Sequence, residues 1–434
     1  LGPLRNRGSY RQSVKDPMCS DGLDSWFASL PLFGEVSEKN WERLDLDYDM
    51  EASPRNLMMV PPVCTATLYS AAVIPVGYLR RRVSDIVHAN PWLSGRLRKG
   101  FDCPFLAIPK VLTEDHFVEC ETPLPIHVAS SFYDVVKHVQ KTEAVLKNGL
   151  ACLNRNESLF RVAVIPAEPK HLKHFFLVVS LNHTIGDGFT FYKLCGMLDP
   201  SVPVVSMNPC RQVGFAHLAA ERIGPAHFNW LTSCPTLVGL LRSLCLWHPE
   251  EPEVREVDQE YISKLKRESE TNGSRVSTND ILTSHLLQQS RFGYGYMSIN
   301  LRNRGLGANE SNAGNYVHRV HLAPENFLCP EGVRKSLSGP QTSAPLGWWE
   351  SMTTRHGLVS NWSHFFQEVF LPGSLHVAHM PVLPYPHPGF GLILIFKPTR
   401  HKLAVYYMIR DREAFADVSS SILLGPKFNP FKSI

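Results

Sequence analysis

The chain carries Leu181-Asn182-His183-Thr184-Ile185-Gly186-Asp187-Gly188 directly behind the apolar run Phe175 to Val179. After it, Phe189 to Leu194 places its apolar residues at helical spacing. This order predicts a strand, a tight Gly-Asp-Gly turn and a helix. Such a turn would hold the imidazole of His183 in a fixed position at a strand end, as proteins present a general base. A lone histidine at a strand end is often purely structural, and it is the flanking glycines and Asp187 that favour a functional role.

Length and composition indicate a globular protein of two domains. A chain of 434 residues exceeds one ordinary core, so two domains of roughly 200 residues are expected. Its 44% apolar and 19% charged residues exclude a disordered chain. The net charge of +4 and the absence of long basic runs disfavour nucleic-acid binding. We expect an N-terminal lobe at 20–205, a proline-rich crossover at 206–257 and a C-terminal lobe at 258–434.

Periodicity predicts most of the secondary structure between these bounds. Strands are expected at Pro61 to Val76, Leu159 to Ile165, Phe175 to Leu181, Phe292 to Leu301, Gly391 to Lys397 and Leu403 to Met408. Helices are expected at Tyr78 to Ala89, Phe132 to Leu146, Asp258 to Glu268, Asn279 to Gln289 and Trp362 to Val369.

Cysteine usage favours a reducing compartment. The ten cysteines contain no CxxC pair, which is typical of buried or free thiols. Leu231 to Trp247 is the most apolar stretch, but Pro235 and Arg242 interrupt it, so a packed or interfacial helix is expected rather than a membrane span. We therefore expect a cytoplasmic monomer. The chain begins at Leu1, which is compatible with a missing targeting segment.

Several further segments follow one another in a characteristic order. They are Asn90-Pro91-Trp92-Leu93-Ser94-Gly95-Arg96-Leu97, Leu159-Phe160-Arg161, Val276 to His285, Asn300-Leu301-Arg302-Asn303-Arg304, Gly314-Asn315-Tyr316 and Ser360-Asn361-Trp362. Together with the HxxxDG motif of His183 to Gly188, this series resembles the BAHD acyltransferases of the chloramphenicol acetyltransferase-like superfamily. The resemblance extends from about Trp26 to Phe415.

The chain departs from the family pattern at two places. The family's DFGWG segment has no match here, and Asn300 stands where the family carries an aspartate. Asn182 occupies the position at which condensation domains and chloramphenicol acetyltransferases have another histidine, which favours the single-histidine acyltransferases.

The resemblance implies an α/β fold of two similar lobes, each a mixed sheet flanked by helices, with a channel between them. It also implies transfer of an acyl group from acyl-coenzyme A to a hydroxyl or amine of a small-molecule acceptor, such as a secondary metabolite. His183 would be the general base in a ternary complex. The coenzyme A thioester would be a co-substrate, with no permanently bound cofactor.

The resemblance also assigns supporting residues around the motif. Asp187 would pair with Arg302 and hold the turn, Gly188 would give the turn room, and Asn315 would pin a loop. A solvent-facing aspartate is the alternative for Asp187.

Two residues would complete the reaction site. Ser360 would offer its hydroxyl to the tetrahedral oxyanion, and Trp362 would form a wall of the tunnel beside His183. An ordinary loop serine and a core tryptophan are the alternatives.

Three His-x-x-His spacings suggest a metal site: His171/His174, His318/His321 and His376/His379. In an extended strand, residues three apart point to opposite faces, so the second and third pairs would not chelate a metal. No third ligand lies at a recognisable spacing, and we expect no metal.

Two other functions are compatible with the sequence. The missing DFGWG segment is consistent with a non-catalytic binding or scaffold protein of the same fold. An acyl-carrier protein, rather than free coenzyme A, is an alternative acyl donor.

Overall fold

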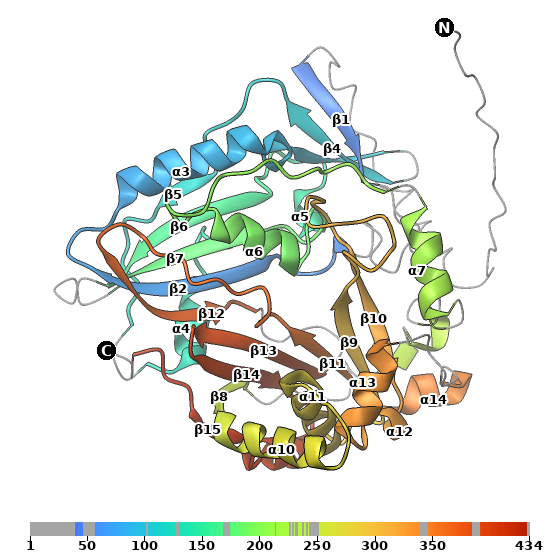
Figure 1. The fold of residues 1–434 in the computed structure, drawn as a ribbon. Helices are drawn as coiled ribbons and strands as arrows, with labels where there is room; N and C mark the ends of the chain where they lie inside the picture. The colour runs from blue at the N-terminus through green and yellow to red at the C-terminus, as the bar shows by residue number, and fades with distance from the viewer. Residues whose placement is uncertain are drawn as a thin grey trace, which may run out of the picture.

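The computed structural model describes residues 40–46, 57–100, 103–126, 130–167, 174–212, 214–224, 251–338, 346–383 and 391–431, with single positions and short stretches between 227 and 242. The chain forms two lobes, each built on a β-sheet (Figure 1). The blue-to-green lobe carries the N-terminal sheet, and the yellow-to-red lobe carries the C-terminal sheet.

The N-terminal lobe is built on a five-stranded mixed sheet with the order β12-β2-β7-β6-β5. Its strands are β2 (Val63–Ala71), β5 (Phe117–Glu119), β6 (Phe160–Pro166), β7 (His174–Leu181) and β12 (Ser374–Pro381). A separate antiparallel sheet joins β1 (Trp41–Asp45), β4 (Pro104–Pro109) and β3 (Arg96–Lys99). The helices of this lobe are α3 (Val76–Ala89), the 3-10 turn η2 (Pro91–Ser94), α4 (Phe132–Val139), α5 (Gly149–Cys152) and α6 (Gly188–Gly196).

The C-terminal lobe has a seven-stranded mixed sheet with the order β10-β9-β11-β13-β14-β8-β15. Its strands are β8 (Glu253–Val257), β9 (Tyr294–Asn300), β10 (Val317–Leu322), β11 (His356–Asn361), β13 (Gly391–Thr399), β14 (Lys402–Met408) and β15 (Leu424–Lys427). Its helices are α10 (Gln259–Thr271), α11 (Thr278–Gln289), α12 (Pro324–Phe327), α13 (Pro330–Ser338), α14 (Trp348–Thr353) and α15 (Arg412–Ser419), and α7 (Phe215–Ile223) lies in the crossover.

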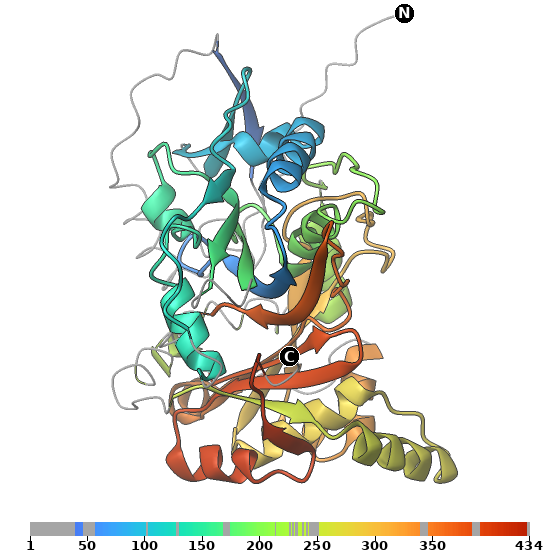
Figure 2. The same ribbon diagram turned by 90° about the vertical axis from the view of Figure 1, so that its left-hand side faces the viewer.

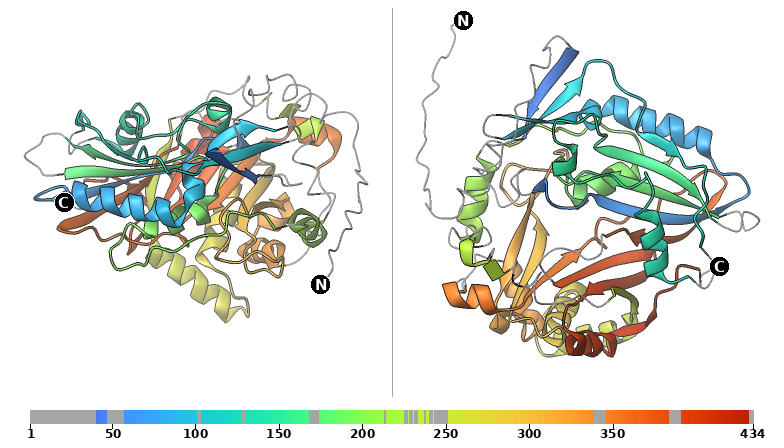
Figure 3. Two further views of the ribbon diagram at one scale, coloured as in Figure 1. Left: turned by 90° about the horizontal axis from the view of Figure 1, so that it is seen from above. Right: turned by 180° about the vertical axis from the view of Figure 1, so that it is seen from behind.

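Alternation along β7 explains how the lobes pack. Phe175, Leu177 and Val179 face one cluster together with residues of α3 and α6. Phe176 and Val178 face the opposite side, in a cluster that also contains residues of α4, β13 and β14. Because a strand points successive side chains to opposite faces, one apolar strand serves two cores. The second core is shared by both lobes, and from behind α4 lies between them (Figure 3).

One strand crosses from the C-terminal half into the N-terminal sheet. β12 follows β11 in the sequence, yet it pairs antiparallel with β2 (Figure 2). A register shift between His376 and Ala378 marks a β-bulge, which pairs His376 with Tyr69 and His379 with Thr67. The bulge adds one residue and so returns both histidines to one face of the sheet.

Most of the expected elements are present, with corrections at two helices. The helix expected at Trp362 to Val369 is wrong, because this segment is a turn followed by irregular chain. The helix expected at Phe132 to Leu146 ends at Val139. The expectations for the N-terminal residues up to 39 and for most of Leu231 to Trp247 lie outside the described residues.

The expected α/β fold of two sheet-based lobes is confirmed. The lobe boundaries stay a prediction; β8 lies inside the expected crossover but joins the C-terminal sheet. The channel between the lobes also stays a prediction. Within the described ranges, every helix is too short or too polar to span a lipid bilayer.

Candidate active site

His183 lies in the turn that follows β7. The backbone N–H of Thr184 donates to Asn182 Oδ1 at 3.0 Å, and that of Ile185 donates to the Asn182 carbonyl at 3.1 Å. The Asn182 amide in turn donates to the Lys147 carbonyl at 3.0 Å. Asn182 is fully buried, so the residue in the position of a second histidine shapes the turn that presents His183.

The C-terminal lobe holds the same turn from the other side. The side-chain amide of Asn315 donates to the His183 carbonyl at 2.9 Å and to the Thr184 carbonyl at 3.4 Å. Because Asn315 belongs to the loop between β9 and β10, the C-terminal lobe binds the His183 carbonyl, while the N-terminal lobe fixes the two following residues through Asn182.

Asp187 caps helix α6 and pairs with Arg302. Its Oδ1 accepts from the backbone N–H of Thr190 at 2.9 Å, and its Oδ2 accepts from that of Tyr316 at 2.9 Å. Arg302 Nη1 donates to Oδ2 at 2.7 Å, and both side chains are only 1% exposed. The predicted ion pair is therefore present, and it joins the two lobes.

The remaining donors of Arg302 are also occupied. They meet the carbonyls of Asn312 and Gly314, the hydroxyl of Thr190 and Oδ1 of Asn300. The guanidinium carbon lies 4.4 Å from the centre of the Phe189 ring and 4.8 Å from that of Tyr316. Asn300 accepts a hydrogen bond from the cation at the position where the family has an aspartate. Thr190 is a further residue of this site, and its position three residues after the aspartate is the usual place for a cap's backbone partner.

Asp187 and His183 have different protonation states for different electrostatic reasons. Burial alone would raise the pKa of Asp187, but the Arg302 charge and hydrogen bonds from Arg302, Thr190 and Tyr316 hold it below the usual value. A carboxylate so engaged remains charged and has no lone pair directed at a substrate. Burial lowers the pKa of His183, and this outweighs the opposing effects of its own backbone carbonyl and of Asp187. The imidazole is therefore neutral at pH 7.

His183 is partly exposed as a residue, although burial of its imidazole is what lowers its pKa. Nδ1 is a buried nitrogen that makes no hydrogen bond within the described part of the chain. A neutral imidazole retains the lone pair that a general base needs.

The structure also brings Trp362 to the motif. The Trp362 ring packs edge-on against Tyr192 at 6.0 Å between centroids, and a Cβ added to Gly188 would lie 3.9 Å from Trp362 Nε1. Ser360 is partly exposed on β11, two residues earlier. The structure therefore places Trp362 next to the last motif residue and Ser360 on the strand that leads to it.

Gly186 is the glycine of the motif whose position leaves no room for a side chain. A Cβ there would lie 2.8 Å from Leu181 Cδ2 and 3.0 Å from Thr190 Cγ2, whereas the contacts at Gly188 are ordinary ones. The steric room expected of Gly188 is thus needed two residues earlier, at Gly186.

Asn361 lies between Ser360 and Trp362 and connects this segment to the rest of the lobe. Its amide donates to Asn279 Oδ1 at 2.8 Å, and its Oδ1 accepts from the backbone N–H of Ser363 at 2.9 Å. Asn279 lies in the first turn of α11, which begins with a capping box of Ser277 and Asp280. The sequence predicted a helix at Asn279 to Gln289, but no sequence signal connected it to Asn361.

The histidine pairs differ from each other in the structure. His171 lies outside the described residues. β10 pairs with β9 without a register shift, which keeps His318 and His321 in alternating positions. The expectation for His376 and His379 is wrong, because the bulge in β12 puts both on one face. In the part of the chain that the structure describes, no group of three or more potential ligands could hold a metal ion.

Comparison with known proteins supports the fold. No family model and no curated protein matches the chain. Among solved structures, TRI101 of F. graminearum in complex with ethyl coenzyme A is 12% identical and superimposes with a TM-score of 0.59, covering 88% of this chain and 97% of that one. Vinorine synthase is 13% identical with a TM-score of 0.58, covering 92% and 96%. The first condensation domain of the CDA synthetase is 12% identical with a TM-score of 0.53, covering 84% and 90%.

These similarities define a class of fold. The chain has the two-lobed fold of the BAHD-type and chloramphenicol acetyltransferase-like acyltransferases, as the sequence resemblance predicted.

Proposed function

We propose that the protein transfers an acyl group from acyl-coenzyme A to a hydroxyl or amine of a small-molecule acceptor. The observation that carries this proposal is His183, a partly exposed residue with a neutral imidazole, whose carbonyl is held by Asn315 of the C-terminal lobe and whose neighbour Thr184 is held by Asn182 of the N-terminal lobe. Support for the donor comes from the TRI101 structures, which contain coenzyme A with deoxynivalenol or with T-2 mycotoxin. We further propose that the protein acts as a cytoplasmic monomer.

In the proposed reaction both substrates are bound at once. His183 takes the proton from the acceptor hydroxyl or amine while the acceptor atom attacks the thioester carbonyl carbon. The carbonyl oxygen becomes a tetrahedral oxyanion, to which Ser360 donates a hydrogen bond. Collapse of this intermediate expels coenzyme A as a thiolate, which takes up the proton from His183. No covalent acyl-enzyme is required.

The other residues would position these groups. Asp187 and Arg302 hold the start of α6 and the loop from the C-terminal lobe in one arrangement. Asn315 fixes the His183 backbone. Trp362 would form the wall beside Gly188.

Substitution of the base tests the proposal. Release of free coenzyme A thiol from a panel of acyl-coenzyme A thioesters with small alcohols and amines first identifies a substrate pair. His183→Ala should then lower turnover by about 10² to 10⁴ without changing the melting temperature. His401→Ala removes an exposed histidine and serves as the matched control, with native turnover. Near-native turnover of His183→Ala would show that the base is assigned wrongly.

A non-catalytic scaffold of the same fold gives a different result. Calorimetry with coenzyme A thioesters of several chain lengths measures whether the native protein binds the donor at all. Binding is expected. Absence of binding for every chain length would favour the scaffold, or a donor carried by an acyl-carrier protein.

A further inference from the structure

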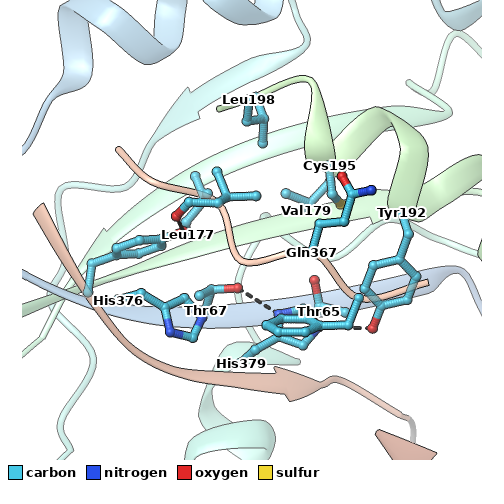
Figure 4. A pocket seen from close by; sticks show the side chains of 13 residues that line it. Thr65, Thr67, Leu177, Val179, Tyr192, Cys195, Leu198, Gln367, His376 and His379 are labelled. Atoms are coloured by element: carbon cyan, nitrogen blue, oxygen red, sulfur yellow. Dashed lines mark hydrogen bonds between the residues drawn. The ribbon is translucent and has the colours of Figure 1, made fainter. Parts of the chain in front are cut away.

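A small cavity of about 20 Å³ lies in the N-terminal lobe, outside the site described above. Side chains from β2, β7, α6, the segment 366–369 and β12 surround it (Figure 4). The polar lining residues are Thr65, Thr67, Tyr69, Tyr192, Gln367, His376 and His379. His183 is not among the lining residues. His376 and His379, which the bulge brings to a common face, therefore both line this cavity.

His379 uses both ring nitrogens inside the protein. Nδ1 lies 2.9 Å from the Thr67 hydroxyl oxygen, and Nε2 lies 2.9 Å from the Tyr192 hydroxyl oxygen (Figure 4). Burial and the neighbouring His376 lower the pKa of His379 to about 3, so the ring is neutral and has one N–H donor and one acceptor. One hydroxyl must donate to the ring and the other must accept from it. In either tautomer, one of the two hydroxyls keeps a hydrogen free to donate.

His376, in contrast, needs a hydrogen-bond donor. Its side chain is 2% exposed, and neither ring nitrogen makes a hydrogen bond within the described ranges. Nδ1 lies 3.4 Å from a carboxylate oxygen of Glu368. A proton on Nδ1 therefore faces the negative charge, which leaves Nε2 as an acceptor without a donor. A buried acceptor of this kind is costly unless a partner satisfies it.

The size of the cavity matches one small partner. A cavity needs at least about 10–15 Å³ to hold a water molecule, and about 20 Å³ is present. A metal ion does not fit this pattern, because both nitrogens of His379 are engaged and the described residues contain no set of three ligands.

We propose that this cavity is a binding site for one internal water molecule. The water donates a hydrogen bond to Nε2 of His376 and accepts one from the free hydroxyl hydrogen of Thr67 or Tyr192. It thereby links β12 to β2 or to α6, next to the Tyr192 ring that supports Trp362. The proposal is independent of the acyltransferase function.

A crystal structure of the full chain, at a resolution that shows ordered waters, tests the site directly. One density peak is expected within about 2.7–3.2 Å of His376 Nε2 and of one of the two hydroxyls. An empty cavity beside an ordered His376 ring, or an anomalous signal of a transition metal at the peak, would overturn the proposal. Crystals pressurised with xenon add a second measurement. Apolar dry cavities take up xenon, so xenon binding in the native protein would also overturn it.

A pair of variants identifies the water's acceptor. His376→Leu removes the acceptor, and loss of the density peak is expected. Thr65→Val is the matched control, because it alters the same lining without touching His376, Thr67 or Tyr192; the peak should remain. Persistence of the peak in His376→Leu would show that another group holds the water, which contradicts the proposal. The experiments on the native protein decide the question even if a variant does not fold.

Discussion

Two different kinds of contact join the lobes. One is the apolar core between the sheets, where side chains of β7 and α4 meet those of β13 and β14. The other is the polar clamp, defined here as Asp187, Arg302 and Asn315 with the backbone groups they bind. Apolar burial is non-directional and roughly proportional to area, whereas hydrogen bonds fix distances and angles. The core therefore holds the lobes together, and the clamp determines where the His183 ring lies.

Breaking the clamp should have the largest effect. Asp187→Ala leaves Arg302 buried without its counter-charge, and removing one partner of a buried pair costs about 3–5 kcal/mol. Both the melting temperature and the turnover should fall, because the same carboxylate caps α6 and binds the Tyr316 backbone. Thermal unfolding and coenzyme A release measure the two effects. Loss of turnover at an unchanged melting temperature would mean that the pair is not structural.

The core should respond in stability far more than in rate. Phe132 on α4 packs within 6.1 to 6.3 Å, between ring centroids, of Phe396, Tyr406 and Phe428 in the other lobe. Phe132→Ala should cost about 3–5 kcal/mol of unfolding free energy. Turnover at a temperature where the variant is folded should remain within about threefold of native. A larger loss of turnover in the folded variant would show that the core, too, positions the base.

As the pH falls, the histidines of β12 should lose their contribution to stability before the clamp does. Burial lowers the pKa of His376 to about 4 and that of His379 to about 3, whereas an unfolded histidine titrates near 6.5. The unfolded chain therefore binds more protons below pH 6.5, and stability that is fully present above this value is lost as the pH falls. The Asp187 contribution is lost only at lower pH, because its folded pKa lies below the usual carboxyl value.

The melting temperature measured from pH 7 to pH 4 tests this order. For His376 the expected loss is about 2–3 kcal/mol over this range. His376→Leu should show a shallower decline than the native protein. Identical slopes would mean that His376 is not neutral in the folded state.

The smallest expected effect on stability is that of a single hydrogen-bond donor. Asn315→Ala removes the amide that binds the His183 and Thr184 carbonyls, at a cost of about 1 kcal/mol in stability. Turnover should fall by about 10- to 100-fold if the base shifts by a fraction of an ångström. Ser311→Ala, at an exposed position of the same loop, is the control. Equal turnover in the two variants would assign the positioning of His183 to Asn182 alone.

Short-range sequence patterns predicted the elements that form from interactions between neighbouring residues. The apolar run of β7, the helix α3 with Leu79, Val83, Ile86 and Val87 buried, and the capping box of α11 all follow from nearest neighbours in the sequence. The Asp187–Arg302 pair was accessible only through the family resemblance, since 115 positions separate the two residues.

The wrong and missing predictions lie where contacts between residues far apart in the sequence determine the local structure. Phe365, Phe366 and Val369 mimic a helical spacing, but the first two pack against the cluster that contains Tyr192 while Trp362 pairs its backbone N–H with Ile395 of β13. β12 was missed because its sequence, Ser-Leu-His-Val-Ala-His-Met-Pro, has little apolar alternation. The bulge within it has no sequence signal, and it alone decides that His376 and His379 share a face.

The path of β12 also constrains when the N-terminal sheet can fold during synthesis. Until residues beyond Pro381 leave the ribosome, β2 has no partner on one side, and its backbone groups there form an open sheet edge. The N-terminal half therefore cannot complete its sheet before most of the protein has been translated, and a nascent chain truncated after α6 exposes an edge that invites association with other strands.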